Sequence, residues 1–475
     1  MTKTIKCDIC VIGGGSGGLS VAAGATQMGA QTVLIEKGRM GGDCLNYGCV
    51  PSKALIAAGK HAHAMTSGEP FGVIPQSPQV DFSRVHNHVH SVIGAIAPHD
   101  SVERFEGLGV QVIQETARFT GPKTVQAGYY EIRARRFVIA TGSSARVPPI
   151  PGLSDVSYFT NETIFDNKTI PGHLITIGAG PIGCELSQAY KRLGAQVSLL
   201  DAVKALPKDD PELTTFVLDS LRCDGISIME SVAINKVEKT SEGIRIMCTH
   251  QNKEHIIDGS HVLVAAGRKP NIDGLDLEAA GINYTPTGIK VDARLRTTNR
   301  RVFAIGDVAG GLQFTHVASY HAGIVIRNAL FRLPAKANHD TVPWVTYTDP
   351  ELAHVGLTEA QANDAGHKNI NVLRWPYEEN DRARAERATE GLVKVVTGSK
   401  GRILGVSIVG TQAGELIQPW VLALTNKLGI RAMAGFISPY PTLGEVNKRI
   451  AGSYYTPTLY SPRTKRVVKM LGRLG

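Results

Sequence analysis

Hydrophobic residues in the first part of the chain form short continuous runs separated by glycine-rich turns. An apolar run at Cys7–Ile12 predicts a buried strand, the turn Gly13–Gly18 follows it, and Leu19–Met28 predicts a helix of small residues. A second strand is expected at Thr32–Ile35, and it ends in Glu36. This order is typical of a dinucleotide-binding unit, in which glycines let the backbone approach a pyrophosphate at the helix N-terminus.

The same pattern occurs again further along the chain. Strands are expected at Leu174–Ile177 and Gln196–Leu200, and the second ends in Asp201. The G-x-G-x-x-G glycines are Gly13, Gly15 and Gly18 in the first copy and Gly178, Gly180 and Gly183 in the second. The acid follows the first glycine by 23 residues in both copies. Two such units predict two dinucleotides and a hydride relay between them.

The hydrophobic pattern changes in the C-terminal part of the chain. Alternating apolar runs in Gly391–Gly410 predict antiparallel strands, and a helix is expected from Ala413 towards Gly429. Nearer the N-terminus, Ala54–Met65 predicts a helix that follows a pair of cysteines. The chain therefore combines two repeated α/β units with a later α+β region.

Composition narrows the class of protein. The 475 residues suffice for two to four domains, and 43% hydrophobic with 20% charged residues is ordinary for a globular enzyme. Seven cysteines are too few for a disulfide scaffold, so a cytoplasmic location without a signal peptide is expected. The net charge of +9 is modest, and we expect no nucleic-acid partner.

The strongest chemical signal is the pair Cys44 and Cys49. A five-residue helical step rises about 7.5 Å, whereas a disulfide needs Cα atoms about 4.4–6.8 Å apart. The Cys44 end must therefore be irregular for a bond to close, and Asn46 and Gly48 make this plausible. Pro51 suits the first turn of a helix, whose N-terminus lowers a thiol pKa. Two unrelated buried cysteines would be the simpler interpretation of the spacing alone.

The run Gly41–Lys53 resembles the redox-disulfide motif of the class I pyridine nucleotide-disulfide oxidoreductases, or flavoprotein disulfide reductases. Mercuric reductase-like and dihydrolipoamide dehydrogenase-like members are the most similar. The resemblance implies an α/β fold with two Rossmann-like domains, for FAD and NAD, and a C-terminal α+β dimerisation domain. The implied segments are an FAD-binding domain at 1–150, an NAD(P)-binding domain at 151–272, a second FAD-binding or central segment at 273–341, a dimerisation domain at 342–456 and a basic tail at 457–475.

The resemblance also assigns roles to residues. It implies that Cys49 faces the flavin, that Cys44 attacks the substrate, and that Lys53 lies beside the flavin and pairs with Glu185. For Lys53 and Glu185 the simpler interpretation is ordinary surface or helix charges. The remaining implied cofactor positions are Glu36, Gly42, Thr141, Gly142, Gly267, Asp307 and Ala318. Asp201 favours NADH over NADPH because a carboxylate repels a 2′-phosphate, although Lys204 lies nearby.

The substrate is indicated by a departure from the family pattern. Most relatives carry a histidine and a glutamate contributed by the other subunit of a homodimer, and here these positions are Tyr440 and Glu445. A phenol is a poor base, so we expect an electrophilic sulfur species, a disulfide or a thiophilic metal ion as substrate. A dihydrolipoamide dehydrogenase acting on a lipoyl-type disulfide is the alternative.

Two further features remain open. The segment from Pro457 is basic and amphipathic, and we expect it to pack on its own body. The alternative is a component docked on a membrane or an acidic partner through this tail. His86 and His90 could share a helix face, but we expect surface histidines and no metal site, because no other ligand lies nearby in the sequence.

Overall fold

In a computed structural model, which describes residues 2–474, the chain forms two compact units, and each is described by itself. Unit 1 contains the described residues up to Thr66 together with Pro75–Ala202 and Ile228–Asn338. Unit 2 contains Ser67–Ile74, Val203–Ser227 and the described residues from His339 onward. Met1 and Gly475, the end residues of the predicted segments 1–150 and 457–475, lie outside the described residues.

The first sheet of unit 1 has the strand order β3-β2-β1-β6-β5-β4, with β18 also paired to β6. Its strands are β1 Lys3–Ile12, β2 Thr32–Ile35, β3 Gln111–Ile113, β4 Ala117–Gly121, β5 Thr124–Ala127, β6 Tyr130–Ile139 and β18 Val302–Ala304. The central pairs are parallel, and Ile9 and Val11 of β1 are fully buried. The predicted strands Cys7–Ile12 and Thr32–Ile35 are confirmed.

Helices α1 (Ser16–Gln27) and α8 (Thr315–Ala329) pack against each other beside this sheet. Small residues of α1 allow the close approach, because a Cβ at Gly24 would lie 2.5 Å from Ile326. β18 and α8 come after residue 300, yet β18 pairs in parallel with β6. The chain therefore returns to its first sheet after building the second one.

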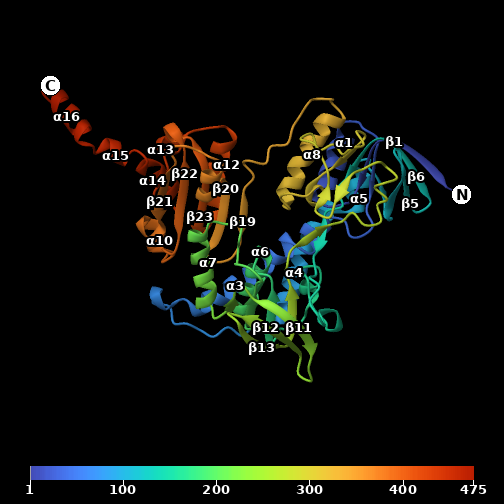
Figure 1. Ribbon diagram of the computed structural model, residues 1–475, viewed down its shortest axis with the longest axis horizontal. Coiled ribbons are helices and arrows are strands. Elements are labelled where there is room, and N and C mark those ends of the chain that lie inside the picture. The colour runs from blue at the N-terminus through green and yellow to red at the C-terminus, as the bar shows by residue number, and fades with distance from the viewer. Residues whose placement is uncertain (1, 475) are drawn as a thin grey trace. The chain divides into compact units, whose positions relative to one another are not determined.

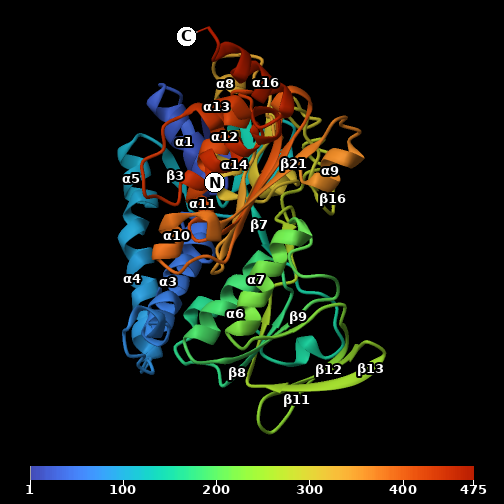
Figure 2. The same cartoon turned by 90° about the vertical axis from the view of Figure 1, so that its left-hand side faces the viewer.

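The second sheet of unit 1 repeats the arrangement of the first. Its strand order is β10-β9-β8-β14, from β8 His173–Ile177, β9 Gln196–Leu200, β10 Ser227–Met229 and β14 His261–Val264. Helix α6 (Pro181–Arg192) follows β8 as α1 follows β1, and Figure 2 shows α6 next to β8 and β9. An antiparallel sheet of β11 Ala233–Lys239, β12 Ile244–His250 and β13 Lys253–Gly259 completes this part. The predicted second α/β unit is confirmed.

Unit 2 is built on a five-stranded sheet in the order β19-β20-β23-β22-β21. The strands are β19 Trp344–Thr346, β20 Glu351–Gly356, β21 Asn371–Pro376, β22 Leu392–Thr397 and β23 Ile403–Gly410. The antiparallel pairing of β22 with β23 confirms the prediction for Gly391–Gly410. The single helix expected from Ala413 is wrong. The chain forms α11 (Ala413–Leu416) and α12 (Gln418–Thr425), because Pro419 cannot continue the helical hydrogen bonds.

A buried lysine joins α7 (Pro211–Cys223) to the sheet of unit 2. Lys394 of β22 has a side chain only 5% exposed, and its ammonium lies 2.8 Å from Asp210, 2.8 Å from Glu212 and 2.9 Å from Glu359. A hydrogen bond from Arg374 and the contact with Lys394 lower the pKa of Glu212 to about 2. The cation is thus compensated by charge inside unit 2.

The chain ends in α13 (Ile430–Gly435), α14 (Glu445–Ser453), α15 (Thr456–Leu459) and α16 (Pro462–Leu471). Figure 1 shows α15 and α16 extending from α14 away from the sheet of unit 2. The expectation that this tail packs on its own body is wrong, because no residue of α15 or α16 is buried. Over residues 2–474, every helix is too short or too polar to cross a membrane.

Candidate active site

Two helices meet at the cysteine pair. Helix α2 (Gly42–Asn46) carries Cys44, and α3 (Cys49–Thr66) begins at Cys49, with Tyr47 and Gly48 between them. The amide of Asn46 donates to the carbonyls of Met40 and Gly42, at 3.0 and 2.9 Å, and closes α2. The predicted interruption of the helix lies where the spacing requires it. Both residues are free cysteines, and their thiols are within hydrogen-bonding reach of each other.

The two thiols have opposite acidities. A hydrogen bond from Cys44 lowers the pKa of Cys49 to about 6, and the Thr315 hydroxyl, 3.4 Å from the sulfur, and the Lys53 ammonium act in the same direction. The pKa of Cys44 is raised well above its ordinary value by its hydrogen bond to Cys49, by burial and by the charge of Cys49. The hydrogen bonds and the Lys53 charge therefore favour ionisation of Cys49 over that of Cys44.

Lys53 and Glu185 form the ion pair that the sequence suggested. The Lys53 ammonium lies 2.8 Å from the Glu185 carboxylate, and the Glu185 side chain is only 6% exposed. Lys53 comes from α3, one turn after Cys49, and Glu185 comes from the second turn of α6. A half-exposed lysine is thus held next to the thiolate by a buried acid from the second α/β unit.

A polar cluster that sequence reasoning missed surrounds Asp43, the residue before Cys44. Asp43 accepts from the guanidinium of Arg268 and from the amide of Asn161, both at 3.1 Å. Asn161 also donates to the carbonyl of Tyr47 at 3.2 Å, between the two cysteines. The Arg268 side chain is only 12% exposed. The motif contains Asp43, but nothing local in the sequence indicates that residues 161 and 268 reach it.

The first glycine turn leaves room for a dinucleotide at the start of α1. Gly13 has φ +109°, and a Cβ there would lie 2.3 Å from the Ala140 carbonyl oxygen. A Cβ at Gly18 would lie 1.9 Å from the Gly13 carbonyl oxygen, so only glycine fits either position. Gly15 is the N-cap of α1 and no side chain caps the helix, which leaves its first N–H groups for a phosphate. The Glu36 carboxylate accepts from the Gly14 N–H at the tip of this turn.

The second glycine turn has the same geometry. Gly178 also has φ +109°, and a Cβ at Gly183 would lie 1.8 Å from the Gly178 carbonyl oxygen. Gly180 is the N-cap of α6, again without a side-chain cap. Asp201 accepts from the Ala179 N–H at 2.6 Å, as Glu36 does from Gly14. Each glycine turn forms a cradle together with the start of the helix that follows it. The two cradles therefore fit two dinucleotides, with one carboxylate at each.

The other predicted cofactor positions gather around the start of α8 and the end of β6. Thr141 donates to the Asn271 carbonyl at 2.7 Å, and the Asn271 N–H donates to the Gly142 carbonyl at 3.0 Å. Asp307 accepts from Ser143 at 2.5 Å, and burial raises the pKa of its carboxyl. Ala318 packs against two glycines, since a Cβ at Gly17 or Gly306 would come within 3.2 or 3.0 Å of it.

Two glycines complete this set of positions. A Cβ at Gly42, with φ +61°, would lie 2.6 Å from the Gly15 Cα, so the cysteine segment touches the first cradle. Gly267, with φ +103°, accepts from the Arg146 N–H at 2.9 Å. The cysteine segment is thus in direct contact with the first glycine turn within unit 1.

Tyr440 and Glu445 lie in unit 2. The Tyr440 side chain is 67% exposed, and its hydroxyl donates to Asp381 at 3.1 Å, which raises the pKa of the phenol. Glu445 is the first residue of α14, and its carboxylate lies 3.4 Å from the guanidinium of Arg449. Asp381 is a second residue that the sequence analysis missed. It keeps Tyr440 a hydrogen-bond donor at neutral pH.

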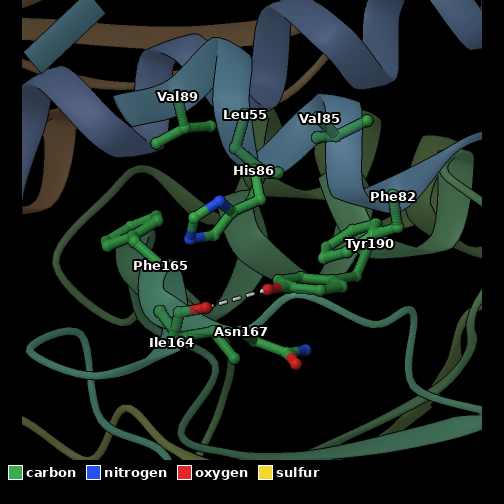
Figure 3. A pocket seen from close by; sticks show the side chains of 9 residues that line it. All are labelled: Leu55, Phe82, Val85, His86, Val89, Ile164, Phe165, Asn167 and Tyr190. Atoms are coloured by element: carbon green, nitrogen blue, oxygen red, sulfur yellow. Dashed lines mark hydrogen bonds between the residues drawn. The ribbon is translucent and has the colours of Figure 1, made fainter. Parts of the chain in front are cut away.

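The histidines of α4 (Phe82–Ile96) lie close together. His86 and His90 do share a helix face, with ring centroids 4.1 Å apart. Figure 3 shows the His86 ring in a small cavity, near Phe165 and Tyr190. His90 contacts the Phe165 carbonyl at 3.1 Å. Among residues 2–474, no group of three or more His, Cys, Asp or Glu side chains could hold a metal ion. These rings are half-buried packing residues rather than the expected surface histidines.

Comparison with known proteins gives similarities over nearly the whole chain. The family model "Pyridine nucleotide-disulphide oxidoreductase" matches residues 7–322, and the model of its dimerisation domain matches residues 342–451. The chain is 34% identical over 441 residues to a mercuric reductase of Bacillus cereus, covering 92% of this chain and 70% of that protein. It is 32% identical over 456 residues to a dihydrolipoyl dehydrogenase of Staphylococcus aureus, covering 94% and 96%. The structure of the HOCl-induced flavoprotein disulfide reductase RclA from Escherichia coli, as a Cu(II) complex, matches with TM-score 0.84 and 26% identity, covering 94% and 99%.

Proposed function

The chain belongs to the pyridine nucleotide-disulphide oxidoreductases and is a flavoprotein disulfide reductase with a dimerisation domain, and we propose that it is a mercuric reductase-like enzyme. Its substrate would be an electrophilic sulfur species or a thiophilic metal ion. The observation that carries the proposal is the low-pKa Cys49, which accepts from Cys44 at the start of α3. Two adjacent sulfurs, one ionised, suit a soft electrophile.

We propose that Cys44 and Cys49 are the redox-active pair. FAD, when bound, supplies the transfer of an electron pair from the nicotinamide to this disulfide. The residues that would hold FAD are those of the first cradle with Thr141, Gly142, Asp307 and Ala318. Lys53, fixed by Glu185, would stabilise the Cys49 thiolate. The overall balance for a disulfide substrate is one nicotinamide oxidised, one proton taken up and two thiols formed.

We propose NADH as the preferred nicotinamide cofactor. The second cradle would hold it, with Asp201 placed at the tip of the glycine turn by its bond to Ala179. A carboxylate there accepts from a ribose hydroxyl and repels a 2′-phosphate. The family uses both FAD and a pyridine nucleotide, and the choice between NADH and NADPH is our proposal.

We propose that two copies form a homodimer, each completing the active site of the other with Tyr440 and Glu445. The dimerisation domain supports the pairing, and the seven cysteines favour a cytoplasmic location. Because the Tyr440 hydroxyl donates to Asp381 and the pKa of the phenol is raised, this residue would stay protonated at neutral pH and would be a poor base. Dihydrolipoamide oxidation needs a base, so we expect it to be slow.

A substrate panel tests the proposal. The holoenzyme with NADH would be offered Hg(II), a persulfide, lipoamide disulfide and glutathione disulfide, and nicotinamide oxidation would be followed by absorbance. We expect Hg(II) or the persulfide to be the best substrate, and Cys44→Ser to abolish its turnover while NADH still bleaches the flavin. Tyr440→Phe should reduce turnover of that substrate. Fast dihydrolipoamide oxidation by the unchanged protein would instead favour the dihydrolipoamide dehydrogenase function.

A further inference from the structure

The C-terminal basic segment, residues 457–474, lies outside both regions matched by the family models, the second of which ends at residue 451. It comprises most of α15 and all of α16. None of the residues of these two helices is buried, and the segment extends from α14 away from the sheet of unit 2 (Figure 1). The family fold therefore gives this segment no role.

The side chains of α16 and its C-terminal end divide into two faces. At 100° per residue, Val467, Met470, Leu471 and Leu474 fall within one arc of the helix, with Val468 at its margin, and Arg463 of the first turn is the one cation in that arc. The opposite arc carries Lys465, Arg466, Lys469 and Arg473. The large apolar side chains are strongly exposed, with 62% of Val468, 59% of Met470 and 53% of Leu471 accessible. A short helix with this division has an apolar face that needs a cover.

The charge of the segment indicates what covers it. Residues 457–475 of the sequence contain five Lys or Arg and no Asp or Glu. A second copy of this segment would repel it, because the basic faces would meet like charge. An anionic lipid surface has a layer of acyl chains that the apolar face can contact and, above it, a layer of charged headgroups that the basic face can contact. Because α16 spans only about 15 Å at 1.5 Å per residue, it would lie in the interface and not cross it.

We propose that residues 457–474 bind the surface of an anionic membrane, with α16 lying in the headgroup region. The apolar face enters the boundary of the acyl chains, and the four cations of the opposite face stay with the headgroups. The enzyme is then recruited to the membrane by its tail while its catalytic residues lie outside the segment. This inference does not depend on the substrate proposed above.

Vesicle co-sedimentation of the holoenzyme tests it. The unchanged protein should bind vesicles of phosphatidylcholine with about one-third phosphatidylglycerol and not vesicles of phosphatidylcholine alone, and salt should weaken the binding. The double variant Lys465→Glu/Lys469→Glu should bind at least about thirtyfold more weakly, from the contribution of each cation near a charged surface. The matched control is the double variant Lys253→Glu/Lys336→Glu, which changes two exposed lysines outside the segment and should bind the vesicles normally.

Two more variants separate the apolar contribution from the charges. Val468→Ser/Leu471→Ser keeps every cation and should also lose binding, because an electrostatic contact alone would not need the apolar face. A protein truncated after Thr456 should lose vesicle binding and keep its bound flavin and the bleaching of that flavin by NADH. Equal binding to both vesicle types, or unchanged binding by the charge-reversed variant, would overturn the inference. So would a truncated protein that becomes monomeric, because the segment would then serve the subunit interface.

Discussion

Replacing Thr315 by valine should raise the pKa of Cys49. The Thr315 hydroxyl lies 3.4 Å from the Cys49 sulfur at the first residue of α8, and it donates to the thiolate. Valine has nearly the same shape but no donor, so the thiolate loses one hydrogen bond while the packing is kept. This hydrogen bond stabilises the neutral thiol less than the thiolate, so its removal mainly destabilises the ionised form.

The size of the shift follows from the strength of such a bond. A hydrogen bond to a charged group contributes about 1.5–3 kcal/mol, and we take the lower end because Cys49 is exposed and the contact is long for an oxygen donor. One pKa unit corresponds to about 1.36 kcal/mol. The pKa of Cys49 should therefore rise from about 6 to about 7 in Thr315→Val. At pH 7 the ionised fraction would fall from about nine-tenths to about one-half.

The assay is the pH dependence of alkylation of the reduced holoenzyme by iodoacetamide, with each cysteine followed by peptide mass spectrometry. Thr315→Ser keeps the hydroxyl and should give the profile of the unchanged protein. Cys223 is exposed and outside the site, so its profile serves as an internal control in every variant. A Thr315→Val profile that overlays the unchanged one would refute the reasoning, because the hydroxyl would then contribute nothing to the thiolate.

Three further predictions concern charges. Asp43→Asn should lower the pKa of Cys49 below its starting value in the same alkylation assay, because the Asp43 carboxylate raises it; an upward shift would contradict this. Asp201→Asn should reduce the ratio of kcat/KM for NADH over NADPH, and an unchanged ratio would remove Asp201 as the discriminating group. Lys394→Met should destabilise the protein by about 3–5 kcal/mol, because carboxylates would lose a buried cation. It should therefore lower Tm in calorimetry, whereas the exposed Lys253→Met should not.

Local patterns predicted much of this fold. The two glycine turns, their helices and the acids that follow them are encoded within about thirty residues each, the length of a single βαβ unit. The helix predicted at Ala54–Met65 is part of α3, which begins five residues earlier, at Cys49, with Pro51 in its first turn. Pro419 indicates the break between α11 and α12, and the prediction of one long helix did not take it into account.

Contacts between distant residues could not be predicted in this way. Thr315 lies 266 positions from Cys49, and Arg268 reaches Asp43 from the far end of the second α/β unit. Asp381 meets Tyr440 only because the chain of unit 2 folds back on itself. The tail showed its amphipathic pattern in the sequence, but its exposure depends on where α14 ends. Periodicity reports the face that a residue occupies and not the partner that it finds there.

The difference between the two thiols limits the chemistry of the proposed site. The charges near the pair alternate in sign, with Lys53 and Glu185 on one side and Asp43 and Arg268 on the other. The bond between the two thiols and the Lys53 charge favour the ionised form of Cys49, so Cys44 holds a proton that it must lose before it can attack. In the proposed homodimer, Tyr440 would be a poor acceptor for that proton, because its bond to Asp381 raises the pKa of the phenol. The acceptor next to Cys44 is the Cys49 thiolate, so Cys44 becomes nucleophilic as Cys49 becomes protonated. A soft electrophile that binds both sulfurs releases this proton without a separate base, whereas oxidation of a dithiol does not, and this favours the proposed substrate class.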